Sequence, residues 1–159
     1  MPQADPRREL AFLIHDVARL LKTYADQKAR QYGMTRAQWA VLVRLQRTEG
    51  LKQSELAEIL DLQPISLTRL LDRLCANGLI ERRPDPEDRR ANRLFLTPAA
   101  KPIVEGLGRL GGELMTTVLE GVEPETVALM LDQLGVAKDN LRKAIQRNGA
   151  PETLEKTYG

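Results

Sequence analysis

A helix predicted over residues 64–77 carries side chains suited to reading base edges. Its apolar residues recur at steps of three and four and predict a buried stripe of Leu67, Leu70, Leu71 and Leu74. The opposite face offers donors, one acceptor and one apolar group: Ile65, Ser66, Thr68, Arg69, Asp72 and Arg73. This mixture suits the donors, acceptors and methyl groups of a DNA major groove. A solvated helix face has a similar composition, so the helix by itself leaves both interpretations open.

An arginine-rich hairpin predicted directly after this helix favours DNA. Residues 79–83 and 92–96 have the character of two short strands, and the PDPEDRRA between them predicts an exposed loop. This segment contains five arginines: Arg82, Arg83, Arg89, Arg90 and Arg93. An arginine at a hairpin tip can enter the narrow, negative minor groove. The neighbouring carboxylates of Asp85, Glu87 and Asp88 can hold the other arginines rigid.

Few other side chains in the sequence are suited to chemistry. The chain has one cysteine, Cys75, and one histidine, His15, which excludes a disulfide framework and a zinc finger or multi-histidine metal site. No acid pair or phosphate-binding loop accompanies them, so neither catalysis nor a cofactor is predicted. Cys75 adjoins Leu74 at the edge of the buried stripe. We expect a half-buried structural thiol there, with a redox role as the alternative.

His15 belongs to a second stripe on the first predicted helix. Phe12, His15 and Arg19 recur at steps of three and four, away from the main apolar stripe. Packing at a dimer contact is one interpretation. The other is a pocket where His15 and Arg19 bind a ligand carboxylate or phenol, with Phe12 or Trp39 as an aromatic wall. Trp39 itself is expected to lie in the core.

Four helices are predicted to lead up to the hairpin. The first ends at Gly33 and carries an apolar stripe of Leu10, Ile14, Val17, Leu21 and Tyr24. The second begins at Thr35, which forms a capping box with Gln38. A short helix over residues 54–60 and a turn over 61–63 lead to Pro64, which suits the first position of the fourth helix.

Two more helices are predicted after the hairpin. Thr97 is expected to cap the fifth, whose main apolar stripe is Ile103, Leu107, Leu110 and Leu114. The sixth restarts at Pro124 and carries Val127, Leu131, Leu134, Leu141 and Ile145 on one side. Because the first, fifth and sixth helices have more apolar surface than one chain can bury, we predict a two-fold dimer.

The composition fits a single globular domain. The chain has 159 residues, 42% of them hydrophobic and 29% charged, with a net charge of +2. We predict a mainly α (α+β) fold: a dimerisation helix over 1–34, a winged helix-turn-helix over 35–97, dimerisation helices over 98–147 and a flexible tail over 148–159. The N-terminus lacks a long apolar core and no apolar run reaches 18 residues, so a cytoplasmic protein is expected.

The sequence also resembles a known family. SELAEIL and the run LQPISLTRLLDRLCANGLIERRPDPEDRRANRLFLTPAAKPIV resemble the winged-helix core of the MarR family of bacterial regulators, over residues 35–105. DRRA at Asp88–Ala91 matches the wing motif D-x-R-[AG], and DRRANRLFLTPAAKPI is similar to the SlyA-like branch. The resemblance implies a homodimer that binds palindromic operators and is often released by phenolic or other aromatic ligands. It assigns Arg69 to the recognition helix, Arg90 to the wing and Asp88 to stabilisation of the wing.

These observations predict a sequence-specific DNA-binding transcriptional regulator, a repressor released by a small aromatic ligand, rather than an enzyme. The expected DNA contacts are Ile65, Ser66, Thr68, Arg69, Arg73, Asp88, Arg89 and Arg90. The expected ligand contacts are Phe12, His15, Arg19 and Trp39. Two alternatives stay open: a SlyA-type global regulator or activator that competes with nucleoid proteins, and a winged helix that binds another protein. Five wing arginines argue against the second.

Overall fold

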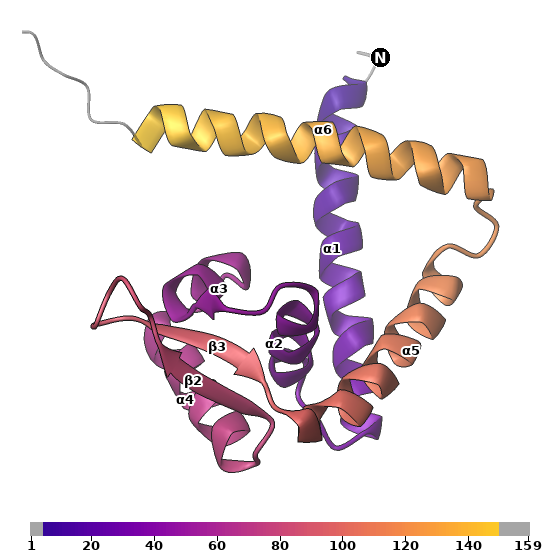
Figure 1. Cartoon of the computed structure of the whole chain (residues 1–159). Coiled ribbons are helices and arrows are strands. Elements are labelled where there is room, and N and C mark those ends of the chain that lie inside the picture. Colours follow the sequence, from indigo (N-terminus) through magenta and orange to yellow (C-terminus); the bar gives the residue numbers. More distant parts are fainter. Residues whose placement is uncertain (1–4, 150–159) are drawn as a thin grey trace, which may run out of the picture. The chain divides into compact units, whose positions relative to one another are not determined.

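The computed structural model describes residues 5–149, which contain six α-helices and one small sheet (Figure 1). The helices are α1 (Pro6–Gln31), α2 (Arg36–Arg47), α3 (Gln53–Ile59), α4 (Pro64–Ala76), α5 (Lys101–Val118) and α6 (Pro124–Gly149). The strands are β1 (Leu51–Lys52), β2 (Ile80–Pro84) and β3 (Asn92–Leu96), and a 3₁₀ turn covers Pro98–Ala100. The chain divides into two units, one up to Val118 and one from Leu119, which we describe separately.

Local signals set the start and the end of α1 and the start of α2. The end of α1 near Gly33 and the start of α2 at Thr35 were predicted, whereas the Asp5 cap was not. The Asp5 carboxylate caps α1 by accepting a hydrogen bond from the Arg7 amide (3.0 Å). Gly33 follows α1 with a φ of +67°, a backbone conformation that is strained for residues with a side chain but not for glycine. The capping box of α2 is present: Gln38 N donates to Thr35 Oγ1 (3.1 Å) and Thr35 N to Gln38 Oε1 (3.0 Å).

One core lies between α1, α2, α4, α5 and the sheet. The C-terminal half of α1 packs on α2 and α5, and α2 also contacts α4 and β3 (Figure 1). The fully buried large side chains of this core are Val41, Leu42, Leu45, Leu56, Leu67, Leu71, Leu74, Leu94 and Val104. The predicted core position of Trp39 is confirmed, since this side chain is only 9% exposed.

The sheet holds the wing against the helices. Its order is β1-β3-β2, with antiparallel pairing of Ile80 to Leu96 and of Lys52 to Arg93. The prediction gave the two wing strands and omitted β1, because two residues are too short to show a periodic pattern. Through β1, the sheet joins the wing to the start of α3.

Two details of the fifth helix differ from the prediction. Thr97 makes no side-chain cap; its hydroxyl donates instead to the Gly78 carbonyl (2.5 Å), and the helix begins with the 3₁₀ turn. The buried stripe of α5 starts at Val104, whereas Ile103 is exposed. Positions 103 and 104 both precede Leu107 by about one helical turn, so the spacing alone does not decide which of them is buried.

Much apolar surface in the two units stays uncovered. The part of α1 up to Leu20 leaves six large hydrophobic residues exposed: Leu10, Phe12, Leu13, Ile14, Val17 and Leu20. In the second unit, α6 has no buried residue and exposes Leu131, Leu134, Leu141 and Ile145. The predicted tail begins at Asn148, but α6 continues to Gly149; the rest of that tail lies outside the described residues.

Candidate nucleic-acid interface

The outer face of α4 projects polar side chains from a firmly anchored helix. Leu67, Leu71 and Leu74 fix α4 in the core, and Leu70 is partly buried beside them. The opposite face exposes Ile65, Ser66, Arg69 and Arg73, as predicted from the sequence. Ile65 is 65% exposed at the start of the helix, where it offers an apolar contact such as a thymine methyl requires.

Two polar groups of α4 are already engaged within the chain. The Thr68 hydroxyl donates to Pro64 O (2.9 Å) and accepts from Gln53 Nε2 (2.8 Å), so its proton is not available to a base. The Asp72 carboxylate accepts from Arg82 Nη2 (2.7 Å), which ties α4 to β2. The face that can read bases is therefore narrower than the sequence pattern suggested.

The structure divides the five wing arginines into two groups. Arg82 pairs with Asp72, and Arg83 pairs with Glu81 while its guanidinium lies 4.0 Å from the centre of the Phe95 ring. Arg93 donates to Asp85 Oδ2 (2.7 Å) and to Gly50 O (3.0 Å). Within residues 5–149, only two of the five arginines, Arg89 and Arg90, form no side-chain ion pair or hydrogen bond. The prediction used all five arginines as evidence against a protein-binding wing. Only two of them are unpaired among the described residues, so that evidence is weaker than the sequence suggested.

Asp85 organises the base of the wing. It is 3% exposed and accepts hydrogen bonds from the backbone amides of Glu87 (2.8 Å) and Asp88 (3.1 Å) and from Arg93. Lys52 Nζ of β1 lies 3.7 Å from Asp85 Oδ2. The Glu87 amide holds the pKa of Asp85 below its usual value, with the Asp88 amide and Arg93 acting in the same direction against the effect of burial.

Asp88 has a smaller, local part in the wing. Its carboxylate accepts a hydrogen bond from the Arg90 amide (3.0 Å), which closes a turn that includes the two unpaired arginines. The family motif pointed to Asp88 as the stabilising carboxylate, but Asp85 makes more and longer-range contacts. The signal for Asp85 was its place before a turn, where Asp commonly accepts from amides two and three residues later.

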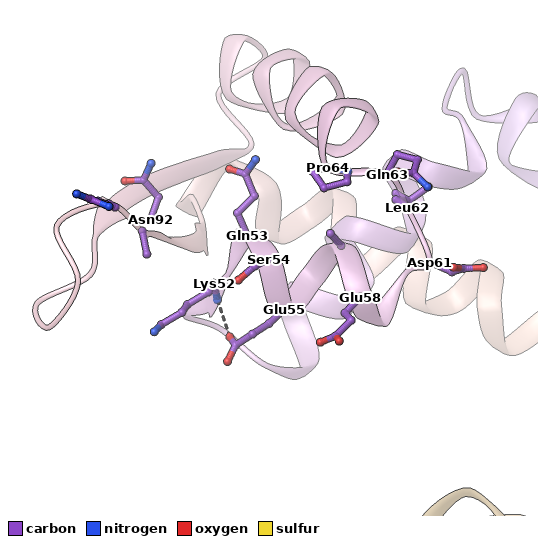
Figure 2. Close-up of a pocket in the computed structure, with 13 residues that line it drawn as sticks. Lys52, Gln53, Ser54, Glu55, Glu58, Asp61, Leu62, Gln63, Pro64 and Asn92 are labelled. Atoms are coloured by element: carbon purple, nitrogen blue, oxygen red, sulfur yellow. Dashed lines mark hydrogen bonds between the residues drawn. The ribbon is translucent and has the colours of Figure 1, made fainter. Parts of the chain in front are cut away.

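A hollow of about 810 Å³, lined by polar and charged residues together with a few apolar ones, separates α3 and the start of α4 from the base of the wing (Figure 2). Lys52, Gln53, Ser54 and Glu55 line it at the junction of β1 and α3, and Arg90, Ala91 and Asn92 line it from the wing. Figure 2 shows Gln53 and Asn92 pointing to one side and Glu55 and Glu58 to the opposite side. The two side-chain amides of this hollow therefore point away from Glu55 and Glu58.

The four predicted ligand contacts do not meet within one chain. His15 and Arg19 line a shallow hollow formed by α1 alone, and Arg19 is 68% exposed, with Nη2 3.7 Å from Asp16 Oδ1. Phe12 is 65% exposed. Trp39 lines a different hollow. Within the unit that ends at Val118, Arg19 is exposed, and its predicted contact with a ligand stays a prediction.

The hollow at Trp39 is apolar with a cationic rim. It measures about 400 Å³ and lies between α1, α2 and α5. Its apolar lining includes Leu21, Ala25, Val43, Leu107, Leu114 and Met115, and its rim carries Arg36, Arg44 and Arg47 of α2. Gly111 faces the Trp39 ring, where an added Cβ would stand 3.7 Å from the ring. The described lining contains no acidic side chain, and none of the rim arginines forms an ion pair with a described residue.

The remaining candidate chemistry is sparse. Cys75 is half-buried as predicted, with its Sγ 3.8 Å from Arg82 Nη1. In the part of the chain that the structure describes, no group of three or more His, Cys, Asp or Glu residues is placed to hold a metal. No helix among those residues is long and apolar enough to cross a membrane.

Comparisons with known proteins show similarity to transcriptional regulators of the MarR family. The sequence model of the MarR family matches residues 34–91. The chain is 27% identical over 135 residues to the uncharacterized HTH-type transcriptional regulator YybA of Bacillus subtilis, covering 83% of this chain and 85% of that protein. The crystal structure of transcriptional regulator PA3341 is 30% identical with a TM-score of 0.75, covering 84% and 98%. A cysteine-to-serine mutant of MarR from E. coli, crystallised with operator DNA, is 28% identical with a TM-score of 0.66, covering 81% and 93%.

Proposed function

The chain belongs to the MarR family and is a DNA-binding transcriptional regulator rather than an enzyme; from this premise we propose that it is a homodimeric repressor of inverted-repeat operators, released by a small aromatic anion. One observation carries the DNA-binding geometry: the exposed face of α4 adjoins a wing whose Arg89 and Arg90 have no partner among residues 5–149. A relative of similar structure has been crystallised with operator DNA. Because such a regulator acts on DNA, we also propose a cytoplasmic location. Placement in the SlyA-like branch stays a prediction.

The two surfaces would read DNA differently. We assign major-groove contacts to Ile65, Ser66, Arg69 and Arg73, with Thr68 contributing its methyl group and its remaining lone pair. We assign the minor groove to Arg89 and Arg90, with Asp88 shaping the loop that carries them. Asp85 supports this role, since a wing fixed at its base loses less conformational freedom when it binds.

The uncovered apolar residues support the dimer. The part of α1 up to Leu20 exposes six large hydrophobic side chains, and α6 exposes another apolar series. Apolar surface of this extent on helices is typical of an interaction site. A second copy of the chain satisfies both the family pattern and the two-fold symmetry that an inverted repeat requires.

Selection from a random DNA duplex pool tests the proposal. We expect an inverted repeat whose half-site centres lie about 10 base pairs apart, because two-fold-related recognition helices meet successive major grooves. An asymmetric site occupied by a monomer would refute the dimer. Failure to shift any duplex at moderate salt would favour the protein-binding alternative. A reporter gene placed behind the selected site separates repression from SlyA-type activation.

We propose that the effector binds in the apolar hollow at Trp39. An aromatic ring suits the apolar lining, and a carboxylate or phenolate suits the rim, where Arg44 is half-buried beside Arg36 and Arg47. Binding would release DNA only if the hollow has a different shape when the recognition helices are spaced for the operator. Phe12, His15 and Arg19 lie on the part of α1 that we assign to the dimer contact, and their role in an effector site stays a prediction.

Fluorescence of the single tryptophan, Trp39, tests the effector site. Titration with benzoates, salicylates and hydroxycinnamates should quench it saturably, and Arg44→Ala should raise the Kd of any carboxylate that binds. Arg19→Ala is the matched control, since Arg19 lies in the separate hollow on α1. A Kd that rises with Arg19→Ala and not with Arg44→Ala would move the site to α1.

A further inference from the structure

We propose that the side-chain amides of Gln53 and Asn92 bind the phosphodiester strand that passes between α4 and the wing. This inference rests on the proposed DNA binding and adds two contacts outside the faces discussed above. On B-form DNA, a major groove is separated from the adjacent minor groove by one sugar–phosphate strand. If α4 occupies the first groove and the wing tip the second, that strand has to cross the hollow between them.

The sheet places the two amides beside each other. Leu51 pairs with Leu94 and Lys52 with Arg93, so Gln53 and Asn92 directly follow the last pair of this ladder. Both line the same hollow, and Figure 2 shows both side chains directed to the side on which α4 begins. Neighbouring positions at the end of a ladder are close enough to contact one phosphate group together.

Gln53 is held in place and still has free hydrogen-bonding capacity. Its Nε2 donates one proton to Thr68 Oγ1 (2.8 Å), and Thr68 in turn donates to Pro64 O (2.9 Å). The second Nε2 proton has no partner among the described residues, and neither has the Asn92 amide. Thr68 is half-buried at the edge of the reading face, so Gln53 lies at the border of α4 rather than on its exposed side.

The charges around the amides suit a phosphate. Arg90 lines the same hollow from the wing, which adds a cation on that side. Glu55 is turned away, because its carboxylate accepts from the Lys52 amide (2.7 Å) at the start of α3. An anionic strand can therefore approach Gln53 and Asn92 without first meeting the acidic side of the hollow.

Alanine substitutions test this contact in the full-length protein bound to its selected operator. A hydrogen bond to a charged acceptor contributes about tenfold in affinity, and each substitution removes one from both half-sites. Gln53→Ala and Asn92→Ala should therefore each weaken binding of the dimer about a hundredfold. The loss should be equal for every operator variant, and the salt dependence should not change, because a neutral amide displaces no counterion. Gln46→Ala is the matched control, an exposed amide of α2 in a different hollow.

Charge changes on both molecules sharpen the test. Gln53→Glu and Asn92→Asp should weaken binding more than alanine does, and most at low salt, because a carboxylate repels the phosphate. A second experiment replaces single phosphates of the operator by neutral methylphosphonates. At one backbone position per half-site, this replacement should lower the affinity of the wild-type protein but not that of Gln53→Ala. Circular dichroism confirms folding, and exposed Asn92 supplies the test if Gln53→Ala is unstable.

Three results would overturn the proposal in distinguishable ways. A loss with Gln53→Ala that depends on one base pair would make Gln53 a base-reading residue. Wild-type affinity in both alanine variants would show that the strand does not contact these amides. A wild-type protein that selects no operator would refute the proposed function itself, before any variant is compared.

Discussion

The wing prediction can be stated as a change in salt dependence. Arg90 is exposed at the wing tip and forms no side-chain ion pair within the described residues, so Arg90→Ala removes a charge without leaving a carboxylate unpaired. Each cation that neutralises a phosphate contributes about 0.9 to the slope of log affinity against log salt. A dimer has two wings, so the slope should become shallower by about 1.8. The ratio of wild-type affinity to variant affinity should then fall about twelvefold as the salt concentration rises from roughly 50 to 200 mM.

Fluorescence anisotropy with a labelled operator measures this slope directly. Arg30→Ala is the matched control, because Arg30 lies on α1 and pairs with Asp26 (2.8 Å). The variant should also lose most affinity on operators with A·T-rich flanks, where the minor groove is narrow. An unchanged slope in Arg90→Ala, or an equal change in Arg30→Ala, would show that the wing arginine does not neutralise a phosphate.

Three further predictions concern α4 and the base of the wing. Arg69→Ala should reduce discrimination at defined major-groove positions by about 1–3 kcal/mol, measured as affinity for single-base operator variants; a uniform loss would place Arg69 on the backbone instead. Asp85→Asn should weaken operator binding more than Asp88→Ala. Because the pKa of Asp85 is lowered in the folded state, its stabilising effect is complete above its unfolded value near 3.8 and is lost as the pH falls through the folded value. Urea midpoints measured against pH should therefore fall less steeply at acidic pH in Asp85→Asn, and parallel curves would contradict this. Leu71→Ala should lower the free energy of unfolding by about 2–5 kcal/mol at fixed protein concentration, since Leu71 is fully buried; a change below about 1 kcal/mol would show that the core closes around the gap.

Local features of the sequence predicted the helices and the reading face. The stripe of Leu67, Leu71 and Leu74 fixes which side of α4 is buried, and so which side is left for DNA. The capping box at Thr35 and the glycine at position 33 fix helix ends, because the groups involved are at most a few residues apart. Interactions within one or two turns of chain depend on residue order alone.

The tertiary structure decided which charges are available. The sequence alone does not distinguish the five wing arginines from one another. In the structure, Arg82 pairs with Asp72 of α4, and Arg93 donates a hydrogen bond to the carbonyl of Gly50, 43 residues away. The family motif likewise favoured Asp88 over Asp85, because the contacts with β1 and β3 that distinguish Asp85 are not visible in the sequence. Pairing of this kind depends on how separate elements are brought together, which a local pattern does not encode.

The lining of the hollow at Trp39 likewise depends on tertiary structure rather than on local sequence. Its apolar lining comes from α1, α2 and α5, so residues more than 60 positions apart, such as Trp39 and Leu107, form one wall. The prediction grouped His15 and Arg19 with Phe12 by helical spacing and added Trp39 as an aromatic wall, but in the structure His15 and Arg19 lie on a surface separate from the hollow at Trp39. The sequence by itself determined the fold class, the recognition helix and the family, because these follow from periodicity and motif. The tertiary structure alone decided which arginines are unpaired and which residues share a cavity, because both depend on distances between elements that the chain order leaves open.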